Sequence, residues 1–327
     1  MSGNRILVTG GSGFIGSALV KALLRGGNRV RVLDDNSRGS PRRLADVAAD
    51  IEFVAADIRD AGAVERATQG IDEVHHLAFV NGTEFFYKAP DLVLDVGVQG
   101  MINVINACRR NDIGTLVLAS SSEVYQTPPN IPTDENVPLV VPDPLNPRYS
   151  YGAGKLISEV MAINYGRKFF QRVLIFRPHN VYGPDMGFEH VIPQFALRLH
   201  ATAKAQPAGR LQFEIQGAGA ATRSFCFIDD LVAGVMAVRD RGEHLGIYHL
   251  GTMEEVSIAD LAQRIAFHAG RDIALIAGPP AEGGTPRRCP DISKVARLGY
   301  KPRVSLDQGL QPTLDWYWNN TDLAPHT

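Results

Sequence analysis

Tyr151 and Lys155 stand four residues apart and are the side chains in this sequence best suited to move a proton. They open a stretch with helical spacing, so both side chains emerge on one face of a helix. A phenol with an ordinary pKa near ~10 is a poor base at neutral pH, but a positive charge nearby favours the phenolate. The pair therefore predicts a general base that acts on an alcohol or sugar hydroxyl. The spacing alone is common, and an exposed pair on a helix is the other interpretation that it allows.

Three glycines at three-residue spacing, Gly10, Gly13 and Gly16, separate an apolar run from a helical stretch near the start of the chain. Residues 6–9 are typical of a buried strand, and residues 15–24 carry apolar side chains at helical spacing. Such glycines let the backbone turn tightly and let a pyrophosphate approach the N-terminus of the helix. The segment predicts a dinucleotide-binding turn, with plain chain reversal as the alternative.

Acidic residues end the next predicted strand, which covers Arg29–Leu33. Asp34 and Asp35 follow it at about the distance expected for a carboxylate that binds the adenosine ribose hydroxyls. Because a 2'-phosphate would meet like charge at Asp34, we expect NAD rather than NADP as the cofactor. Arg38 is the residue that could instead accommodate NADP.

Strands and helical stretches alternate along the first half of the chain, which predicts parallel pairing and a doubly wound α/β sheet of the Rossmann type. The further predicted strands are Ile51–Ala55, Glu73–Ala78, Thr115–Ala119 and Arg172–Phe176. Residues 120–123, Ser-Ser-Ser-Glu, follow one of these strands at the carboxyl edge, where ligands of open α/β sheets bind. We expect a serine hydroxyl there to hydrogen-bond the substrate oxygen that Tyr151 deprotonates.

Two long helical stretches, Asp91–Arg110 and Tyr151–Phe170, are apolar on more than one face. Each must therefore be covered on both sides. A homodimer contact through this pair is the expectation, and burial within one chain is the alternative.

A change of composition near Gly183 indicates a second, smaller mixed α/β domain that binds the substrate. Thr202–Gly209 has the composition of a connector, and Leu211–Ile215 alternates like a strand. Gly283–Pro290 is rich in loop-forming residues, and Leu306–Asn319 is typical of a closing helix. The predicted division is a Rossmann domain over residues 1–177 together with 226–252, and a substrate domain over residues 178–225 and 253–327.

Length and composition are ordinary for a globular enzyme, with 327 residues, 45% apolar residues and a formal net charge of −2. The charge gives no electrostatic case for nucleic acid or an acidic membrane surface, so small molecules are the expected partners. We find no signal-peptide pattern and no apolar run of membrane-spanning length, and we expect a cytoplasmic protein with no membrane partner. His179, Glu189 and His190 match no compact ligand spacing, so no metal is expected.

In the order of its motifs, the sequence resembles the extended short-chain dehydrogenase/reductase family, and specifically its nucleotide-sugar epimerases, dehydratases and decarboxylases. The likeness spans nearly the whole chain. It runs through residues 9–16 (TGGSGFIG), 57–58 (DI), 76–78 (HLA), 120–125 (SSSEVY), 151–155 (YGAGK), 177–184 (RPHNVYGP), 222–225 (TRSF) and 287–291 (RRCPD).

The resemblance implies roles for individual residues. NAD would be held by Gly10, Gly13, Phe14, Ile15, Gly16, Asp34, Asp35, Asn36, Asp57, Ile58, Leu77, Ala78, Tyr151 and Lys155. The catalytic set would be Ser121, Tyr151 as base, Lys155 as its tuner, and Glu123. A nucleoside-diphosphate sugar would be bound by Ser122, Asn180, Val191, Arg223 and one of Arg287 and Arg288. Arginine suits the diphosphate because a guanidinium can pair with it through two hydrogen bonds.

The sequence departs from the family at two places near the predicted cofactor. Gly97 stands where relatives usually carry an asparagine directed at the cofactor, and residues 79–87 differ from the usual loop. These differences bear on the nicotinamide contact and the sugar pocket, and they leave the fold unchanged.

The family's three reactions all begin with hydride transfer from the sugar C4, so Tyr151 and Lys155 do not choose among them. A 4,6-dehydratase typically has an Asp-Glu pair after its serine or threonine, and here Ser122 replaces that aspartate. A uronate decarboxylase usually has an arginine after Tyr-Gly-Pro, and here Asp185 stands at that position. An epimerase needs neither residue, so we expect a 4-epimerase of a nucleoside-diphosphate hexose, with the decarboxylase and the dehydratase as alternatives.

Two other classes of protein share this fold. An NAD-binding regulator would not need Ser121, Tyr151 and Lys155 together, and all three are retained. A sterol or ketone reductase would have no use for Arg223 and Arg287 at positions that contact a diphosphate. Both classes are therefore less favoured than a nucleotide-sugar enzyme.

Overall fold

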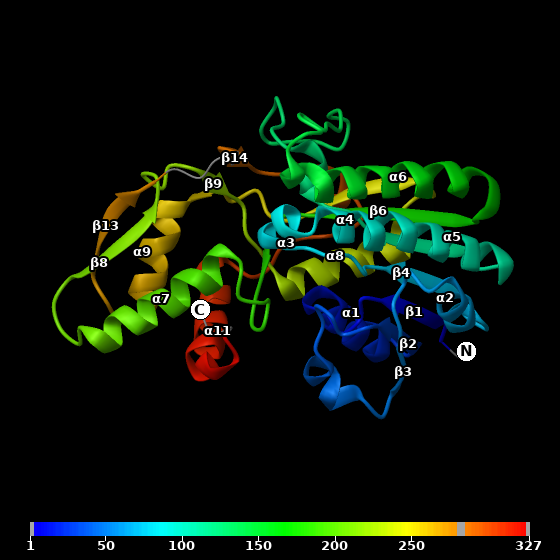
Figure 1. Ribbon diagram of the computed structural model, residues 1–327, viewed down its shortest axis with the longest axis horizontal. Helices are drawn as coiled ribbons and strands as arrows, with labels where there is room; N and C mark the ends of the chain where they lie inside the picture. Colours follow the sequence, from blue (N-terminus) through cyan, green and yellow to red (C-terminus); the bar gives the residue numbers. More distant parts are fainter. Residues whose placement is uncertain (1–2, 280–284, 325–327) are drawn as a thin grey trace.

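The computed structural model describes residues 3–279 and 285–324, and its largest element is a seven-stranded parallel sheet (Figure 1). In spatial order the strands are β11 (Gly246–Leu250), β6 (Arg172–Pro178), β5 (Thr115–Ala119), β4 (Glu73–His76), β1 (Arg5–Thr9), β2 (Arg29–Asp34) and β3 (Ile51–Ala55). Every neighbouring pair is parallel. The chain order changes direction between β1 and β4, which is the arrangement of a doubly wound Rossmann sheet and confirms the predicted fold class.

The two faces of the sheet are covered by different helices, because consecutive strand residues point to opposite sides. The covering helices are α1 (Phe14–Arg25), α2 (Ala61–Thr68), α5 (Gly100–Arg110), α6 (Ser150–Phe169) and α8 (Ile228–Arg241). In β1, Ile6 and Val8 belong to the apolar cluster that includes α1 and α8, whereas Leu7 belongs to the cluster that includes α2, α5 and α6. The three central residues of the strand, Ile6, Leu7 and Val8, are therefore all apolar and buried, as expected for a parallel strand buried on both faces.

The helical stretch predicted over residues 91–110 is interrupted. It consists of α4 (Pro90–Leu94), a π-helical turn over Asp95–Gln99, and α5. A short helix, α3 (Thr83–Lys88), precedes it. A π turn places one extra residue in the turn and widens the helix locally, and Gly97 lies at its centre. The predicted helical stretch is therefore confirmed, with a π turn inside it that the sequence did not indicate.

The second half of the chain adds smaller sheets and three longer helices. These elements are β7 (Val181–Tyr182), α7 (Val191–Ala205), β8 (Leu211–Gln216), β9 (Thr222–Arg223), β10 (Cys226–Phe227), β12 (Val256–Ser257), α9 (Ile258–His268), β13 (Ile273–Gly278), β14 (Arg287–Arg288), α10 (Ser293–Ala296) and α11 (Leu306–Asn319). The predicted strand at residues 211–215 and helix at residues 306–319 are confirmed as β8 and α11. The connector predicted at residues 202–209 is wrong in its first half, because α7 continues to Ala205. Of the loop predicted at residues 283–290, residues 283 and 284 lie outside the described residues.

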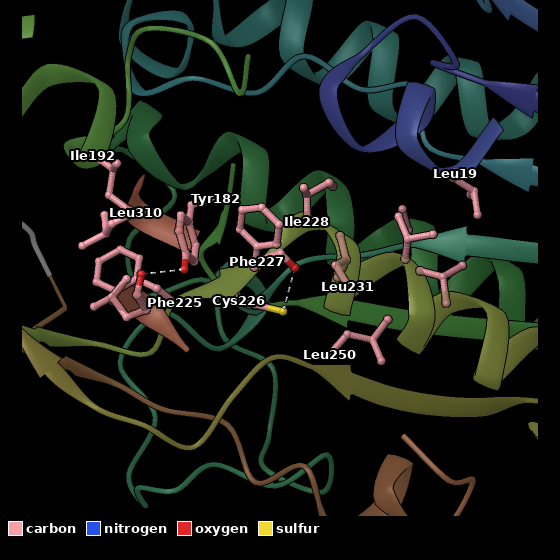
Figure 2. Packing of buried hydrophobic residues seen from close by; sticks show 14 of the residues in the cluster. Leu19, Tyr182, Ile192, Phe225, Cys226, Phe227, Ile228, Leu231, Leu250 and Leu310 are labelled. Carbon is pink, nitrogen blue, oxygen red and sulfur yellow. Dashed lines mark hydrogen bonds between the residues drawn. The ribbon is translucent and has the colours of Figure 1, made fainter. Parts of the chain in front are cut away.

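One apolar cluster joins the large sheet to these smaller elements. Figure 2 shows Leu19 of α1, Leu250 of β11, Phe225, Ile192 of α7 and Leu310 of α11, which all belong to this cluster. The predicted division into two domains by residue range stays a prediction. No helix among the described residues is long and apolar enough to cross a membrane.

Candidate active site

A cavity of about 460 Å³ opens at the carboxyl ends of β1, β4 and β5, where the strand order changes direction. This volume is typical of a small-molecule site. The predicted residues that line it are Gly10, Gly13, Phe14, Ile15, Gly16, Asp34, Asp35, Asp57, Ile58, Leu77, Ala78, Ser121, Ser122, Glu123, Tyr151, Lys155, Asn180, Val191 and Arg288. Asn36, Arg223 and Arg287 are not among its described lining residues. Segments far apart in the sequence thus converge on one cavity.

The glycine turn leaves the N-terminus of α1 open toward this cavity. Gly10 has a φ of +72°, and a Cβ atom there would lie 2.7 Å from the backbone nitrogen of Ala78. A Cβ at Gly16 would overlap with the carbonyl oxygen of Gly10. Gly13 caps the helix without a side-chain hydrogen bond, so free N–H groups of the first turn face the cavity. Free N–H groups and the helix dipole fit the pyrophosphate of a dinucleotide.

The carboxylate of Asp34 holds the glycine turn against β2. It accepts hydrogen bonds from the backbone nitrogens of Ser12 and Asn36, both at 2.9 Å. Asn36 in turn accepts a hydrogen bond at 2.8 Å from the Ser12 hydroxyl, so it supports the turn from outside the cavity wall. Asp34 is therefore a structural anchor of the turn as well as a negative charge in the cavity.

Arg38, the residue that could have accommodated NADP, lines the cavity but already pairs with other groups of the protein. Its guanidinium donates hydrogen bonds at 2.9 Å to Glu189 and to the carbonyl oxygen of Asn81. The same guanidinium lies 4.4 Å from the ring centroid of Phe85. These contacts compete with binding of a 2'-phosphate, and together with Asp34 they favour a cofactor without one.

Tyr151, the predicted base, lies in the first turn of α6 and is 7% exposed. Burial raises the pKa of its phenol, a hydrogen bond with Ser121 opposes this, and the charge of Glu123 adds to it. Burial outweighs the other effects in the protein alone, and the predicted effect of Lys155 on this phenol stays a prediction. A further positive charge is therefore needed to favour the phenolate.

Lys155 lies one turn further along α6 and is nearly completely buried. Its Nζ donates a hydrogen bond at 2.7 Å to the carbonyl oxygen of Ala119, the last residue of β5. Burial lowers the pKa of the ammonium to about 7, although the charge of Glu159 opposes the shift. The lysine is thus fixed between α6 and the carboxyl end of β5, with a charge that changes near neutral pH.

Arginines gather around Glu123 at the other end of the cavity. Arg288 forms an ion pair with Glu123 and donates a hydrogen bond at 3.0 Å to the Thr285 hydroxyl. Burial opposes ionisation of Glu123, but the charges of Arg288, Arg148 and Arg223 keep the pKa of its carboxyl below the ordinary value. Burial and the nearby charges of Arg288 and Arg148 lower the pKa of Arg223 to about 10. Three cations around one carboxylate leave an excess of positive charge, which suits an anionic ligand.

The neighbouring arginines at positions 287 and 288 occupy different surroundings. Arg287 is exposed and forms an ion pair with Glu255, with hydrogen bonds of 2.9 and 3.0 Å. Arg288 is 7% exposed and lines the cavity. Consecutive residues of the short strand β14 point to opposite sides, so the two can hardly share one ligand. Arg288 is therefore the better candidate for substrate contact.

The two positions that bear on the choice of reaction are also resolved. Ser122 lines the cavity and is buried. Asp185 forms ion pairs with Arg42 at 2.9 Å and with Arg43 at 3.1 Å, and it is not among the described lining residues. The cavity thus has the neutral hydroxyl of Ser122 where a dehydratase has an aspartate. The carboxylate of Asp185, where a decarboxylase has an arginine, is held outside the cavity wall.

The sequence matches the family model of the NAD dependent epimerase/dehydratase family over residues 6–251. The chain belongs to this family. NAD is accordingly its cofactor, and the open N-terminus of α1 fits the pyrophosphate of that molecule. The reactions of the family include those of epimerases, dehydratases and decarboxylases that act on nucleotide sugars.

Named relatives of this family member carry different activities. A putative UDP-glucose 4-epimerase of Methanocaldococcus jannaschii is 32% identical over 96% of the chain and 99% of its own length. The UDP-glucuronic acid decarboxylase 2 of Arabidopsis thaliana is also 32% identical, over 94% of the chain and 67% of the relative. The dTDP-glucose 4,6-dehydratase of Streptomyces venezuelae, solved with NAD bound, is 32% identical with a TM-score of 0.85, covering 98% of the chain and 99% of the relative. Equal similarity to three activities does not select one of them.

Sequence reasoning assigned no role to an aromatic wall of the cavity. Phe79 and Phe86 line the cavity, with Val80 beside them, and both rings pack on the ring of Tyr151. Arg148, three residues before Tyr151, was also missed, although its charge acts on Glu123 and Arg223. The only signal in the sequence was that residues 79–87 differ from the usual loop of the family. This difference indicates where the site is unusual, but it does not predict which residues these side chains contact.

The residues considered and rejected as metal ligands have other surroundings. Glu189 pairs with Arg38, and the His179 ring is buried with its centroid 4.8 Å from that of His249. Within residues 3–279 and 285–324, no group of three or more His, Cys, Asp or Glu side chains could hold a metal ion.

Proposed function

We propose that the protein is a 4-epimerase of a nucleoside-diphosphate hexose. The observation that carries this proposal is the set of Ser121, Tyr151 and Lys155, which line the cavity together. Ser122 offers no acidic proton at the position where a dehydratase has an aspartate, and Glu123 is ion-paired with Arg288. An epimerase needs only a group that removes and returns one proton at the 4-hydroxyl.

The roles of the side chains follow from their positions. Ser121 holds the 4-hydroxyl by a hydrogen bond, and Tyr151 as phenolate accepts its proton. When bound, NAD supplies the acceptor for the C4 hydride, and its positive charge favours the phenolate. Lys155 holds the end of β5 through the carbonyl oxygen of Ala119 and places a charge near the phenol. The same tyrosine then returns the proton after the keto-sugar has presented its other face.

The cations at the far end of the cavity support a diphosphate as the anionic part of the substrate. Arg288 is buried at the wall, and Arg223 and Arg148 act on the same region through their charges. Asn180 also lines the cavity, and its side chain is fixed by a hydrogen bond of 3.0 Å to the carbonyl oxygen of Ser224. A diphosphate can displace Glu123 from Arg288 or share the guanidinium with it.

The experiment that tests this proposal uses the purified protein without added NAD. It is incubated with UDP-, dTDP-, GDP- and CDP-hexoses that carry deuterium at C4, and with a UDP-hexuronate. We expect a product of unchanged mass and changed configuration at C4, with the deuterium retained, because an epimerase returns the hydride to the carbon that it left. Loss of water would indicate a dehydratase, and loss of carbon dioxide a decarboxylase. No product from any sugar, with NAD bound, would favour the regulatory protein.

We also propose a homodimer through α6. Ile157 and Val160 are 37% and 42% exposed in the single chain, although the helix also contributes to the core of the sheet. Val160→Lys should therefore shift the sedimentation equilibrium from dimer to monomer. A cytoplasmic location and the two-domain division stay predictions.

A further inference from the structure

Phe79 occupies the space between the two most important side chains of the proposed mechanism. It lies three residues after the end of β4, and its ring centroid lies 4.1 Å from the Nζ of Lys155. The ring also meets the Tyr151 ring edge-on, with centroids 5.2 Å apart and planes at 83°. One aromatic side chain thus contacts both the ammonium and the phenol.

This position of Phe79 depends on glycines in two neighbouring helices. A Cβ at Gly97 would overlap with the Cζ of Phe79, and a Cβ at Gly154 would lie 2.9 Å from the same atom. Gly97 stands at the centre of the π turn over residues 95–99, where the helix is widened. Gly154 lies in α6 directly before Lys155. A side chain at position 97 would therefore require the Phe79 ring to move from this position.

We propose that Phe79 is a positioning residue that holds Lys155 and Tyr151 in this protein, in the space that a side chain at position 97 would otherwise fill. Its face binds the ammonium of Lys155, and its edge fixes the ring of Tyr151. The role assigned to these two residues rests on the proposed function. The contact itself does not depend on the identity of the sugar.

The ring of Phe79 has two opposite effects on the charge of Lys155. It excludes water, which disfavours the ammonium, and its π-face attracts the cation. The other groups that act on Lys155 are Glu159 on its own helix, which favours the charge, and the carbonyl oxygen of Ala119 on β5. His76 on β4 stays neutral, because burial and the charge of Lys155 lower its pKa to about 3. Substitutions of Phe79 can therefore distinguish the two effects on the charge of Lys155, the exclusion of water and the attraction of the ammonium by the ring.

The test follows the titration of Lys155 by NMR in full-length protein labelled at lysine Cε and Nζ, with the signal assigned by its loss in Lys155→Met. Phe79→Leu keeps an apolar cover and removes the π-face, so the midpoint should fall by about 0.5 to 1 pH unit. Phe79→Ala admits water, so the midpoint should rise. Phe86→Leu is the matched control. Phe86 stacks on Tyr151 with centroids 5.1 Å apart and has no such contact with Lys155, so its loss should leave the midpoint unchanged.

A second measurement uses the exclusion between positions 79 and 97. Gly97→Asn should displace the ring and lower turnover, and Phe79→Ala combined with Gly97→Asn should be less impaired than the sum of the two single changes. An unchanged Lys155 midpoint in Phe79→Leu, or the same shift in Phe86→Leu, would overturn the proposal. The titration needs no substrate, so a shifted midpoint without any sugar turnover would contradict the proposed function and leave the positioning role standing.

Discussion

Two regions that line the same cavity, the glycine turn after β1 and the aromatic wall after β4, use glycine for different purposes. At the turn, Gly10 adopts a φ of +72° and Gly16 lets main chain pack against main chain. At the wall, Gly97 and Gly154 stand in helices, where their lack of a Cβ gives room to the Phe79 ring. The first region suits an anion that approaches backbone N–H groups, and the second suits a ring that approaches a lysine.

The difference concerns which part of the site faces the predicted cofactor and which part lies against the predicted base. Asp34 anchors the turn through hydrogen bonds from the backbone nitrogens of Ser12 and Asn36, and we expect this region to bind the cofactor rather than the sugar. The wall of Phe79 and Phe86 lies against Tyr151, the proposed base. Substitutions of Tyr151 or Lys155 should therefore change turnover, those of Arg288 should change substrate binding, and those of Asp34 should change the choice of cofactor.

The largest effect is expected from Tyr151→Phe. Loss of the phenol removes the proton acceptor, so turnover should fall about 10²- to 10⁴-fold, while fold and NAD binding are kept. Initial rates on the sugar accepted by the wild type check this, together with calorimetric titration of NAD. Tyr149→Phe, two residues earlier in the chain and outside the described cavity wall, is the control and should be nearly as active as the wild type. Near-normal turnover in Tyr151→Phe would exclude this tyrosine as the base.

Lys155→Met should also lower turnover severely, but its effect on stability should depend on pH. The pKa of Lys155 is about 7 in the folded protein, below its ordinary value of 10.5, so the unfolded chain binds more protons between these values. The wild type therefore gains stability as the pH rises through this window, and the methionine variant lacks this gain. The Tm of the variant, measured by calorimetry, should therefore fall relative to the Tm of the wild type as the pH rises from 7 to 10. A difference independent of pH would mean that Lys155 titrates normally.

Arg288→Met and Arg287→Met compare two neighbours of which only Arg288 lines the cavity. A hydrogen bond to a charged group contributes about 1.5–3 kcal/mol, so Arg288→Met should raise the KM or the Kd of the nucleotide sugar about 10- to 150-fold. Arg287→Met removes an exposed ion pair with Glu255 and should change binding little. The reverse ranking would place the substrate contact at Arg287.

The distance along the chain between contacting residues determines how far each region can be predicted from the sequence. The glycine turn and Asp34 lie within one β1–α1–β2 unit, and Tyr151 and Lys155 lie within one helical turn, so the local sequence pattern indicates the arrangement within each group. The contact of Phe79 with Gly97 and Gly154 joins three separate elements, and no local pattern encodes it. The pKa of Tyr151 was also out of reach, because it depends on burial by distant segments.

Asp34→Ala should act on the choice of cofactor and on the stability of the turn at once. Removing the carboxylate lessens repulsion of a 2'-phosphate and removes an acceptor for the ribose, so the preference for NAD over NADP should fall roughly 10-fold. The backbone nitrogens of Ser12 and Asn36 also lose their acceptor, so Tm should fall by several degrees. Calorimetric titrations with both cofactors check this. Equal binding of NAD and NADP by the wild type would contradict the assignment.

The smallest effect on turnover is expected from Glu123→Gln, and it also separates the proposed reaction from its alternatives. In an epimerase this residue only neutralises and orients Arg288, so kcat should fall by less than about 10-fold. As a base at the sugar C5, the same residue would be indispensable, and the loss would approach the 10²- to 10⁴-fold expected of Tyr151→Phe. Because Gln keeps the shape and removes the charge, Arg288 becomes a stronger site for the diphosphate, and KM should stay level or fall. A loss of kcat as large as in Tyr151→Phe, with KM unchanged, would therefore make Glu123 a second proton-transfer group and favour a dehydratase over the epimerase.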